Sequence, residues 1–559
     1  MQVIFSSIAA AVRDRGFRFR ASVEQLVLLT VLFWAVVGNR PFFVAALKDR
    51  SFSDGGTWGF ALALVVLLVI LHFILLIFFA NRWTVKPLLA LLIITTAPAI
   101  YFMQVYGVYL DPSMLRNVLR TDRAEASELL SWGLLAHLLL YAVVPLLFLW
   151  RVKIVERSWG HAVLRRIATV LLGVLIAGTT LLAIFQPLAS LMRNHKEVRY
   201  LITPANYLWS MASIMATTAR GAAMPRQAIG LDAVPGASWT IDDKPVLLML
   251  VIGETARGAN WGLNGYPRPT TPELARLPVI NFNDVTSCGT NTEVSLPCMF
   301  APLGRRNYDA QRINGSESLL HVLARAGVGI HWRDNQSGCK GVCEGLSNDS
   351  VAALAPPGLC AGGRCLDGGL LFGLDERLAN ATGRQLLVMH QLGNHGPSYF
   401  RRYPQEFSRF QPACENDDLQ KCTREEIVNA YDNALSYTDH VLAGLIAKLR
   451  AHAGKIDAAL LYVSDHGESL GENNLFLHGL PYAIAPKEQT QVPMVLWFSP
   501  GFAQRLAIDI DCLKQRATQP ASHDHLFHTV LGMLDVHTRL YEPDWDLLNG
   551  CRHRPTRSP

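Results

Sequence analysis

The sequence predicts two unlike regions: an N-terminal helical domain that spans a membrane, and a C-terminal α/β domain built on a mostly parallel sheet. Half of the 559 residues are hydrophobic and only 17% are charged, so part of the chain is expected to lie in lipid. Residues 1–200 contain 20 Lys and Arg against 10 Asp and Glu, whereas residues 201–559 contain 31 against 35. Because nucleic-acid binding needs clustered positive charge, the acidic second region argues against it.

Five apolar segments of spanning length account for the first region. They cover residues 23–43, 58–80, 87–108, 132–150 and 167–186, and about 20 apolar residues suffice to cross a bilayer. The first is interrupted by Asn39, Arg40 and Pro41. No small-residue cleavage site follows it, so we interpret it as a retained helix rather than a signal peptide. We therefore expect a five-helix transmembrane domain over residues 1–187.

Basic residues beside these segments predict that the N-terminus lies in the cytoplasm. Eleven Lys and Arg lie on the N-terminal side of the membrane and six on the other, and positive charge favours the cytoplasmic side. An odd number of spans then places everything after residue 187 outside the cytoplasm. The eleven are Arg13, Arg15, Arg18, Arg20, Arg82, Lys86, Arg151, Lys153, Arg157, Arg165 and Arg166.

The ten cysteines all stand at or after Cys288, which agrees with an oxidising compartment for the second region. Zinc ribbons are the alternative, but the spacings within the close pairs are three, four, seven and nine residues, and few His lie beside them. Disulfides are therefore expected, paired by proximity, although sequence alone leaves their connectivity open. The pairs are Cys288–Cys298, Cys339–Cys343, Cys360–Cys365, Cys414–Cys422 and Cys512–Cys551.

Residues 188–243 combine an amphipathic helix with a linker, and an α/β pattern begins at Lys244 and extends to residue 559. The runs VLLMLVIGE, QLLVMHQLGNHG, AALLYVSDHGE and VPMVLWFS are continuous apolar strands that end in polar or Gly residues. Such runs are typical of a buried, mostly parallel sheet whose site lies at the carboxyl ends of its strands.

Candidate metal ligands follow these strands. Glu254, His395 and the Asp465–His466 pair each stand after an apolar run, and His478 follows twelve residues later. Carboxylate oxygen and imidazole nitrogen together suit Zn²⁺. Each residue alone is commonly structural, but their recurrence at equivalent strand ends indicates a metal site.

The segment TSCGTNTEVSLPCMF offers a nucleophile. Thr292 stands at the expected N-terminus of a short helix, where free N–H groups and the helix dipole favour a phosphoryl oxygen. A threonine hydroxyl needs a base or a metal to react. Taken alone, Thr292 is more simply an N-cap.

Two further groups of polar residues are explained most simply without a functional role. Asn117, Thr121 and Glu125 recur every four residues in a helical segment, so they share one face of the helix. Exposure of that face to solvent is enough to explain their polarity. His525 and His528 of SHDHLFH could share a metal-binding face, but a helix capped by Ser522 or Asp524 is simpler.

Several motifs in order give the chain its resemblance to a known family. They are GETAR at 253–257, SCGTNT at 287–292, NQSGCKGVC at 335–343, HQLGNHGP at 390–397 and SDHGESLGE at 464–472. They resemble the membrane-bound phosphoethanolamine transferases that modify lipid A, within the alkaline-phosphatase-like (sulfatase-like) superfamily. This family includes the transmissible colistin-resistance enzymes.

The resemblance implies a zinc ion and a set of site residues. It implies that zinc is held by Glu254, Thr292, Asp465 and His466, and that Thr292 carries phosphoethanolamine in a covalent intermediate. His395 and His478 match positions that contact the transferred phosphate or a second zinc, and either is a candidate general acid. The remaining matches are Lys340 and Gln336 in a phosphate-binding loop, Asn117, Thr121 and Glu125 in donor-lipid handling, and Glu468 beside a ligand histidine.

The implied reaction moves phosphoethanolamine from phosphatidylethanolamine to a lipid A phosphate in two steps, with polymyxin resistance as its consequence. The implied location is the bacterial inner membrane, with a periplasmic catalytic domain and a monomeric enzyme. Another acceptor (core heptose, periplasmic glucan or pilin) stays open. So does a membrane-anchored protein that only binds a phosphorylated ligand.

Two relatives in the superfamily fit less well. Phosphoglycerol transferases generally lack dense disulfides, and sulfatases need Cys or Ser at the position of Thr292.

Overall fold

The computed structural model describes residues 19–155, 157–221, 226–240, 244–361 and 364–552, and it divides into two compact units. The first comprises Met1–Pro112 and Ser131–Ser213, and the second comprises Ser113–Leu130 and Ile214–Pro559. The segment Ser113–Leu130, which the sequence analysis placed in the transmembrane domain, thus groups with the C-terminal unit. Arg13, Arg15 and Arg18, which contributed to the predicted orientation, lie outside the described residues, as do the last three linker residues, 241–243.

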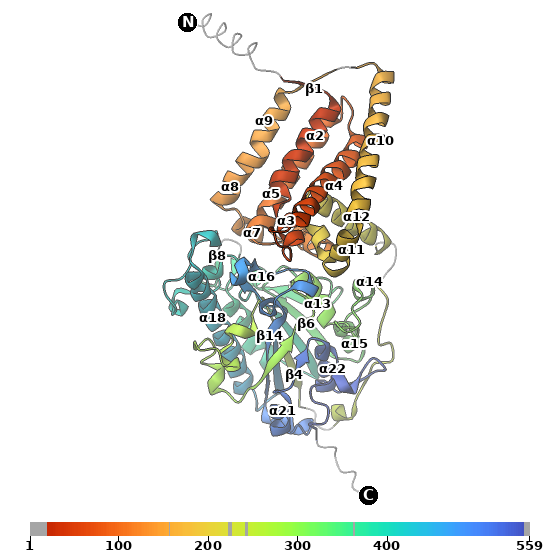
Figure 1. Ribbon diagram of the computed structural model, residues 1–559. Coiled ribbons are helices and arrows are strands. Elements are labelled where there is room, and N and C mark those ends of the chain that lie inside the picture. The colour runs from red at the N-terminus through yellow and green to blue at the C-terminus, as the bar shows by residue number, and fades with distance from the viewer. Residues whose placement is uncertain (1–18, 156, 222–225, 241–243, 362–363, 553–559) are drawn as a thin grey trace, which may run out of the picture. The chain divides into compact units, whose positions relative to one another are not determined.

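Four helices of the first unit are long and apolar enough to cross a membrane (Figure 1). A fifth span exists only if a bent pair is counted as one, because α2 with its π-helical extension, Val23–Gly38, meets α3 at 57°. Five spans are therefore not established, although the membrane character of this unit is. The elements are α2 (Val23–Phe33), α3 (Arg40–Leu47), α4 (Gly55–Phe79), α5 (Val85–Val105), the composite Trp132–Arg151 of α8 (Trp132–Leu138) and α9 (Val144–Arg151), and α10 (Trp159–Ala183).

The bend after α2 is stabilised by Asn39, which is fully buried. Its side chain donates to the carbonyls of Trp34 and Thr203 and accepts the Thr203 N–H, all at 2.9 Å. Pro41 lies in the first turn of α3 and cannot continue the helix before it. The interruption seen in the sequence is thus a specific, hydrogen-bonded break.

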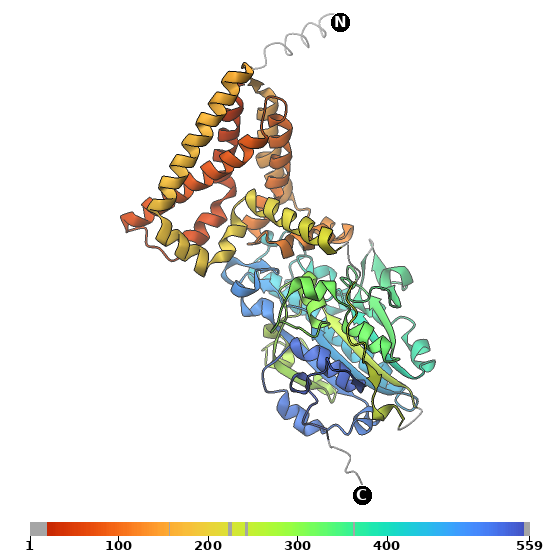
Figure 2. The same cartoon turned by 90° about the vertical axis from the view of Figure 1, so that its right-hand side faces the viewer.

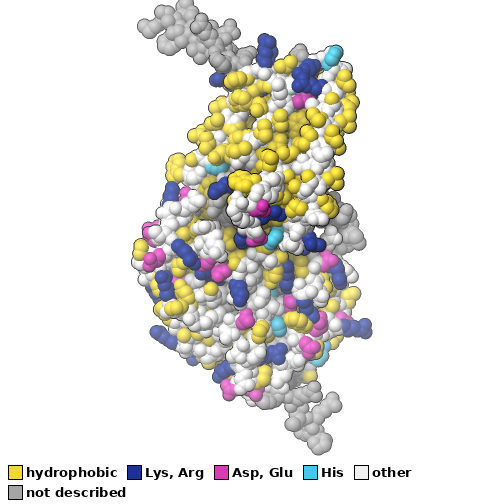
Figure 3. Space-filling model, in the orientation of Figure 1, with side chains coloured by type: hydrophobic (Ala, Val, Ile, Leu, Met, Phe, Trp, Pro, Cys, Tyr) yellow, Lys and Arg dark blue, Asp and Glu magenta, His cyan; other side chains and the backbone are white. Residues whose placement is uncertain are grey.

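Hydrophobic side chains cover the outward surface of these helices in the view of Figure 3, as expected for contact with lipid. Figure 2 shows that α10 is followed by α11 (Phe185–Asn194), which turns away from its axis, and by α12 (Ala205–Gly221). The one amphipathic helix predicted within residues 188–243 corresponds to α12, whereas α11 begins before that range.

An eight-stranded sheet forms the centre of the second unit, in the order β15-β5-β14-β11-β4-β10-β6-β7. All neighbouring pairs are parallel except those made by β14, so the prediction of a mostly parallel sheet is confirmed. The strands are β4 (Val246–Gly253), β5 (Ile280–Thr286), β6 (Gly329–Asp334), β7 (Asn348–Ser350), β10 (Arg384–His390), β11 (Asp457–Ser464), β14 (Gln491–Phe498) and β15 (Ala521–Ser522).

Helices cover both faces of this sheet (Figures 1 and 2). In β4, Leu248 and Leu250 belong to the core that includes α15 (Leu319–Arg325) and α22 (Asp524–Met533), while Met249 faces the core of α18 (Arg424–Ala451). Burial on both faces explains the continuous apolar runs and fixes the strand ends. The other helices are α13 (Thr292–Met299), α14 (Ala310–Gly315), α16 (Val351–Leu354), α17 (Leu374–Ala379), α19 (Lys487–Thr490), α20 (Pro500–Arg505) and α21 (Ile510–Arg516).

The ten cysteines form the five disulfides predicted from proximity, and no free cysteine remains in the described chain. One of them, Cys288–Cys298, joins the loop before α13 to that helix.

Candidate active site

Glu254, Asp465 and His466 meet because of strand register. β4 and β11 are parallel neighbours with Gly253 opposite Ser464, so the residues that follow each strand are adjacent. All three side chains are fully buried, and their ligand atoms lie within 4.8 Å of one another. This arrangement of two carboxylates and one imidazole is a possible metal site.

The electrostatics of this cluster call for a cation. Burial and the neighbouring Glu254 carboxylate raise the pKa of Asp465. The Oδ2 atom of Asp465 is buried and has no hydrogen-bond partner among the described residues. The Nδ1 atom of His466 lies 2.9 Å from the Gly467 carbonyl, which leaves Nε2 facing Glu254 at 3.3 Å. A divalent ion would offset the repulsion between the two buried carboxylates.

Thr292 faces the same cluster from the N-terminus of α13. Asn291 is the N-cap, since its side chain accepts the Val294 N–H, so the N-cap interpretation of Thr292 is wrong. The Thr292 hydroxyl is thereby free for other contacts. It lies 3.1 and 3.2 Å from the Glu254 carboxylate oxygens and 3.4 Å from His466 Nε2.

His523 connects the loop before Thr292 to the strand that carries Asp465. Its Nδ1 accepts the Cys288 N–H at 3.0 Å, and its Nε2 lies 2.9 Å from the Ser464 carbonyl. Burial lowers the pKa of His523 to about 3, so the ring is neutral and fits one donor and one acceptor contact. Among the histidines of SHDHLFH, His525 and His528 lie three residues apart on α22, and no group of three possible metal ligands in the described residues includes them. His525 contacts Ser522, and His528 accepts the Glu542 N–H.

His395 and His478 lie next to the cluster. Their ring centroids are 5.2 Å apart, and the His478 ring lies 4.4 Å from that of His466. Glu468 was expected to orient a metal-ligating histidine. Its Oε2 lies 3.1 Å from Nδ1 of His478, which is one of the candidate ligands, so this role stays a prediction.

Lys340 and Gln336 form contacts within their own loop. The Lys340 ammonium donates to the carbonyl and hydroxyl of Ser337, and the Gln336 side-chain oxygen accepts the Ser337 N–H. Within the described residues, neither side chain forms a hydrogen bond with Thr292. The phosphate-binding role expected for this loop stays a prediction.

Asn117 and Glu125 lie on two separate short helices, and Thr121 lies between them, so the three do not share one continuous helical face. α6 (Pro112–Arg120) ends where the Thr121 hydroxyl donates to the Asn117 carbonyl, and α7 (Arg123–Glu128) begins after Asp122, which accepts the Glu125 N–H. These side-chain bonds compete with helix continuation. The solvent-face interpretation is wrong for Glu125, whose Oε1 lies 3.3 Å from His395 Nε2.

The Glu125–His395 pair controls the charge of both groups. Burial disfavours the imidazolium, but the Glu125 carboxylate outweighs it and raises the pKa of His395 to about 9. Although burial opposes it, the charge of His395 lowers the pKa of Glu125 to about 2. At neutral pH both groups are therefore ionised. His395 then carries a proton that it can donate, close to the cluster of Glu254, Asp465 and His466.

Sequence reasoning missed three residues beside this pair. The carboxylate of Glu128 pairs with Arg402, with oxygen–nitrogen distances of 3.1 and 2.5 Å, and with Arg364 at 2.9 Å. Arg402 in turn donates from Nε to the His395 carbonyl at 2.7 Å. Glu128 lies three residues after Glu125, which is one helical turn, and that spacing was an available signal.

His390 was also missed as a site residue. It is the last residue of β10 and is fully buried, with Nδ1 2.9 Å from Asp334 and Nε2 3.9 Å from Glu254. His395, which was expected at the end of this strand, comes five residues later.

Comparisons with known proteins match both regions of the chain. A family model described as Sulfatase matches residues 247–536, and one described as Phosphoethanolamine transferase EptA/EptB matches residues 67–219. Phosphoethanolamine transferase EptA of Escherichia coli K12 is 41% identical over 84% of this chain and 86% of its own length. The chain belongs to the phosphoethanolamine transferase family. Mcr-1 from Escherichia coli, a phosphatidylethanolamine transferase, is 38% identical over 93% of this chain and 96% of its own length.

A solved structure of a family member supports the two-part architecture. The integral membrane lipooligosaccharide phosphoethanolamine transferase EptA from Neisseria meningitidis superposes with a TM-score of 0.91 at 37% identity. The match covers 96% of this chain and the whole of that chain. The family fold, a membrane domain followed by a sulfatase-like domain, therefore applies to this protein.

Proposed function

We propose that the protein transfers phosphoethanolamine from phosphatidylethanolamine to a lipid A phosphate, with Thr292 as the nucleophile. One observation carries this proposal: the Thr292 hydroxyl, at a helix N-terminus, faces Glu254 and His466 within hydrogen-bonding distance. Family membership supplies the group transferred, and the names of the relatives favour lipid A as acceptor.

The metal is proposed to be zinc, held by Glu254, Asp465, His466 and the Thr292 oxygen. Mixed oxygen and nitrogen donors suit Zn²⁺. The buried Oδ2 of Asp465, which accepts no hydrogen bond from the described residues, is available to contact a cation. When bound there, zinc would lower the pKa of the Thr292 hydroxyl and neutralise phosphate charge.

The reaction has two displacements at phosphorus. In the first, Thr292 Oγ1 bonds to the phosphorus of phosphatidylethanolamine, the phosphorus–oxygen bond to diacylglycerol breaks, and diacylglycerol takes up a proton. In the second, a lipid A phosphate oxygen attacks the same phosphorus and the Thr292 oxygen leaves and regains a proton. The helix N-terminus at Thr292 favours the negative charge of both transition states.

The neighbouring residues have proposed roles in these steps. Protonated His395 is the proposed acid for diacylglycerol, and His478, oriented by Glu468, is the alternative. Lys340 and Gln336 are proposed to turn from Ser337 toward the phosphate when substrate binds. Three residues are proposed to position the donor lipid: Asn117, Thr121 and Glu125.

The proposed location is the bacterial inner membrane with the catalytic unit in the periplasm. The five disulfides and the positive charge beside the predicted cytoplasmic ends support this orientation. Capping a lipid A phosphate with an ammonium group would lower its attraction for cationic polymyxins, which leads us to propose colistin resistance as the phenotype.

Intact-protein mass spectrometry after incubation with phosphatidylethanolamine and zinc tests the nucleophile. The wild type is expected to carry a phosphoethanolamine adduct that Thr292→Ala lacks, while Thr518→Ala, at an exposed threonine, keeps it. Mass spectrometry of lipid A from cells expressing each variant tests the acceptor. Unchanged lipid A beside a modified glycan would overturn the acceptor, and an adduct on Thr292→Ala would overturn the nucleophile.

A further inference from the structure

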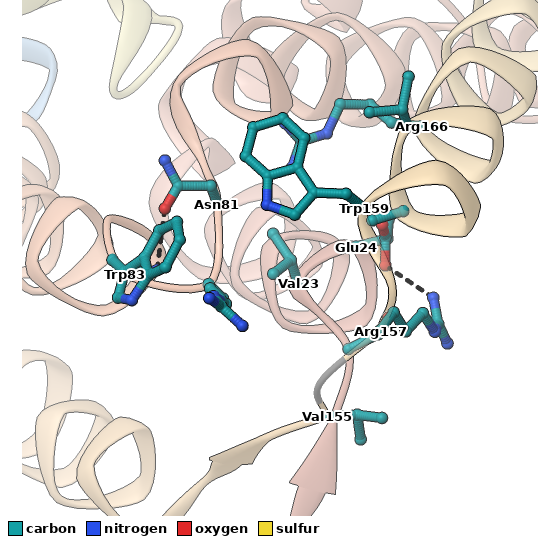
Figure 4. Close-up of a pocket in the computed structure, with 12 residues that line it drawn as sticks. Val23, Glu24, Asn81, Trp83, Val155, Arg157, Trp159 and Arg166 are labelled. Carbon is teal, nitrogen blue, oxygen red and sulfur yellow. Dashed lines mark hydrogen bonds and ion pairs between the residues drawn. The ribbon is translucent and has the colours of Figure 1, made fainter.

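A cavity lies at one end of the helices of the first unit. None of its lining residues belongs to the candidate active site. It is formed by the start of α2, the turn between α4 and α5, and the start of α10, and it encloses about 120 Å³ (Figure 4). Its lining residues are Ser22, Val23, Glu24, Asn81, Arg82, Trp83, Val155, Arg157, Trp159, Ala162, Val163 and Arg166.

The wall of this cavity is positively charged and has unmet hydrogen-bonding capacity. Among the residues that the structure describes, this wall contains three arginines against one carboxylate, Glu24. The ion pair between Glu24 Oε2 and Arg157 Nη1 spans 3.5 Å, longer than a normal hydrogen bond. Glu24 Oε2 and the Nε of Arg166 are both buried without a hydrogen-bond partner in the part of the chain that the structure describes. Such groups are costly unless a ligand satisfies them.

Two tryptophans place the cavity at the depth of lipid headgroups. Trp83 and Trp159 are 62% and 74% exposed, and they stand just beyond the apolar end of α4 and at the first residue of α10. Tryptophan gathers at the membrane–water interface, where its ring is amphipathic. The guanidinium of Arg82 lies 4.0 Å from the centre of the Trp83 ring, beside the cavity.

We propose that this cavity binds the headgroup of an anionic glycerophospholipid, such as phosphatidylglycerol. The phosphate would accept hydrogen bonds from Arg166 and Arg82, and a glycerol hydroxyl would donate to Glu24. A phosphodiester with a neutral headgroup reduces the net positive charge of the wall, whereas the zwitterion phosphatidylethanolamine leaves it unchanged. Basic pockets between membrane helices are known to favour anionic headgroups.

The bound lipid would stabilise the position of α10 against the other helices of the first unit. Only 6% of the apolar stretch of α10 is buried within the protein, against 50% for α4. A headgroup that contacts α2, the α4–α5 turn and α10 together would add to the protein's own contacts there, such as the hydrogen bond from Arg166 Nη2 to the Ala80 carbonyl.

Thermal unfolding of the delipidated full-length protein tests the proposal. Phosphatidylglycerol is expected to raise the unfolding temperature more than phosphatidylethanolamine, and to bind about tenfold more weakly to Arg166→Gln, which loses a charge-assisted hydrogen bond. Arg165→Gln is the matched control, since Arg165 is exposed, adjacent in sequence and outside the cavity. Measurements in the Thr292→Ala background prevent turnover of phosphatidylethanolamine.

Three outcomes would overturn the proposal: no preference for phosphatidylglycerol, equal binding by the Arg166 and Arg165 variants, or the same stabilisation by inorganic phosphate alone. The last would indicate a soluble anion. If Arg166→Gln does not fold, Arg82→Gln carries the test, because Arg82 lies on an exposed turn and its replacement leaves the core unchanged. Binding by Arg82→Gln equal to the wild type would then count against the site.

Discussion

Two sets of charged side chains border the candidate active site, and the fold holds them in different ways. Glu254, Asp465 and His466 follow two paired central strands and are fully buried, so backbone register fixes them. Glu125 and Glu128 lie on α7, a short helix between two apolar segments, and reach the catalytic sheet's loops through ion pairs. We expect the strand-end set to be indispensable and the α7 set to contribute in graded steps.

Asp465→Asn is expected to show the largest effect. The transfer rate should fall about 10³-fold or more, since losing one group that stabilises transition-state charge already costs about 10²–10³-fold. The variant also lacks a metal ligand, so a chelator should lower the unfolding temperature of the wild type but not of Asp465→Asn. Rate measurements with phosphatidylethanolamine and thermal unfolding with and without chelator check both effects.

The control for this change is Asp544→Asn, an exposed aspartate in the same unit, which should behave as the wild type. If the Asp465→Asn enzyme keeps a tenth of the wild-type rate, Asp465 contributes in graded steps as the α7 set does. The expected difference between the strand-end set and the α7 set is then wrong.

Glu128→Gln is expected to have the next largest effect. Removing one partner of a buried ion pair costs about 3–5 kcal/mol, and the side chains of Glu128 and Arg402 are 2% and 1% exposed. The expected result is a lower unfolding temperature together with a slower transfer rate, because Arg402 also holds the His395 carbonyl. Glu425→Gln, at an exposed glutamate on α18, is the matched control.

A double-mutant cycle with Arg402→Gln then measures the coupling. If the two single changes are additive, the pair does not connect α7 to the catalytic loop, and our account of the α7 set is wrong.

Glu125→Gln is expected to change the pH profile more than the rate at neutral pH. The pKa of His395 is about 9, above its ordinary value of 6.5, because the Glu125 carboxylate outweighs burial. The stability from this pair is therefore fully present between about pH 4.5 and 6.5, and it is lost as pH rises through 9 or falls through about 2. Without the carboxylate, burial dominates and the alkaline limb of the kcat/KM profile should move to lower pH.

The pH profile separates two roles for Glu125. A Glu125→Gln enzyme that is slower at every pH, with an unmoved alkaline limb, would mean that Glu125 acts on the donor lipid and not through His395.

The strand-end set could be predicted from sequence because its signal is local. Apolar runs that end in Glu254 or Asp465 indicate both the strand and its polar end. Close spacing along the chain sufficed for four of the five disulfides, and Cys512–Cys551, 39 residues apart, was the pair that remained. The direction of β14 could not be predicted, since a continuous apolar run is the same in parallel and antiparallel strands.

Failures of prediction occurred where a single side-chain bond or a distant partner decides the structure. Asn291 caps α13 in place of Thr292, a shift of one residue between two good capping types. At the break after α6, the Thr121 hydroxyl donates to the Asn117 carbonyl and Asp122 caps α7. Glu128 and Arg402 are 274 residues apart, and no local pattern pairs them.

Arg120→Gln is expected to have the smallest effect and marks the limit of the graded class. Arg120, on α6, lies 2.5 Å from Glu293, the residue after Thr292, but its side chain is 52% exposed. The Glu293 side chain is only 3% exposed, but solvent screens the Arg120 end of the pair. Ion pairs screened in this way contribute at most about 1 kcal/mol, so the rate should fall less than about fivefold. Because salt screens exposed charges, the difference from the wild type should disappear near 1 M salt, as rate measurements over a series of salt concentrations would reveal.

Arg123→Gln, at a neighbouring exposed arginine, is the control and should show no change. A loss as large as that of Glu128→Gln, and independent of salt, would mean that α6 holds the nucleophile helix as firmly as strand register holds the metal ligands.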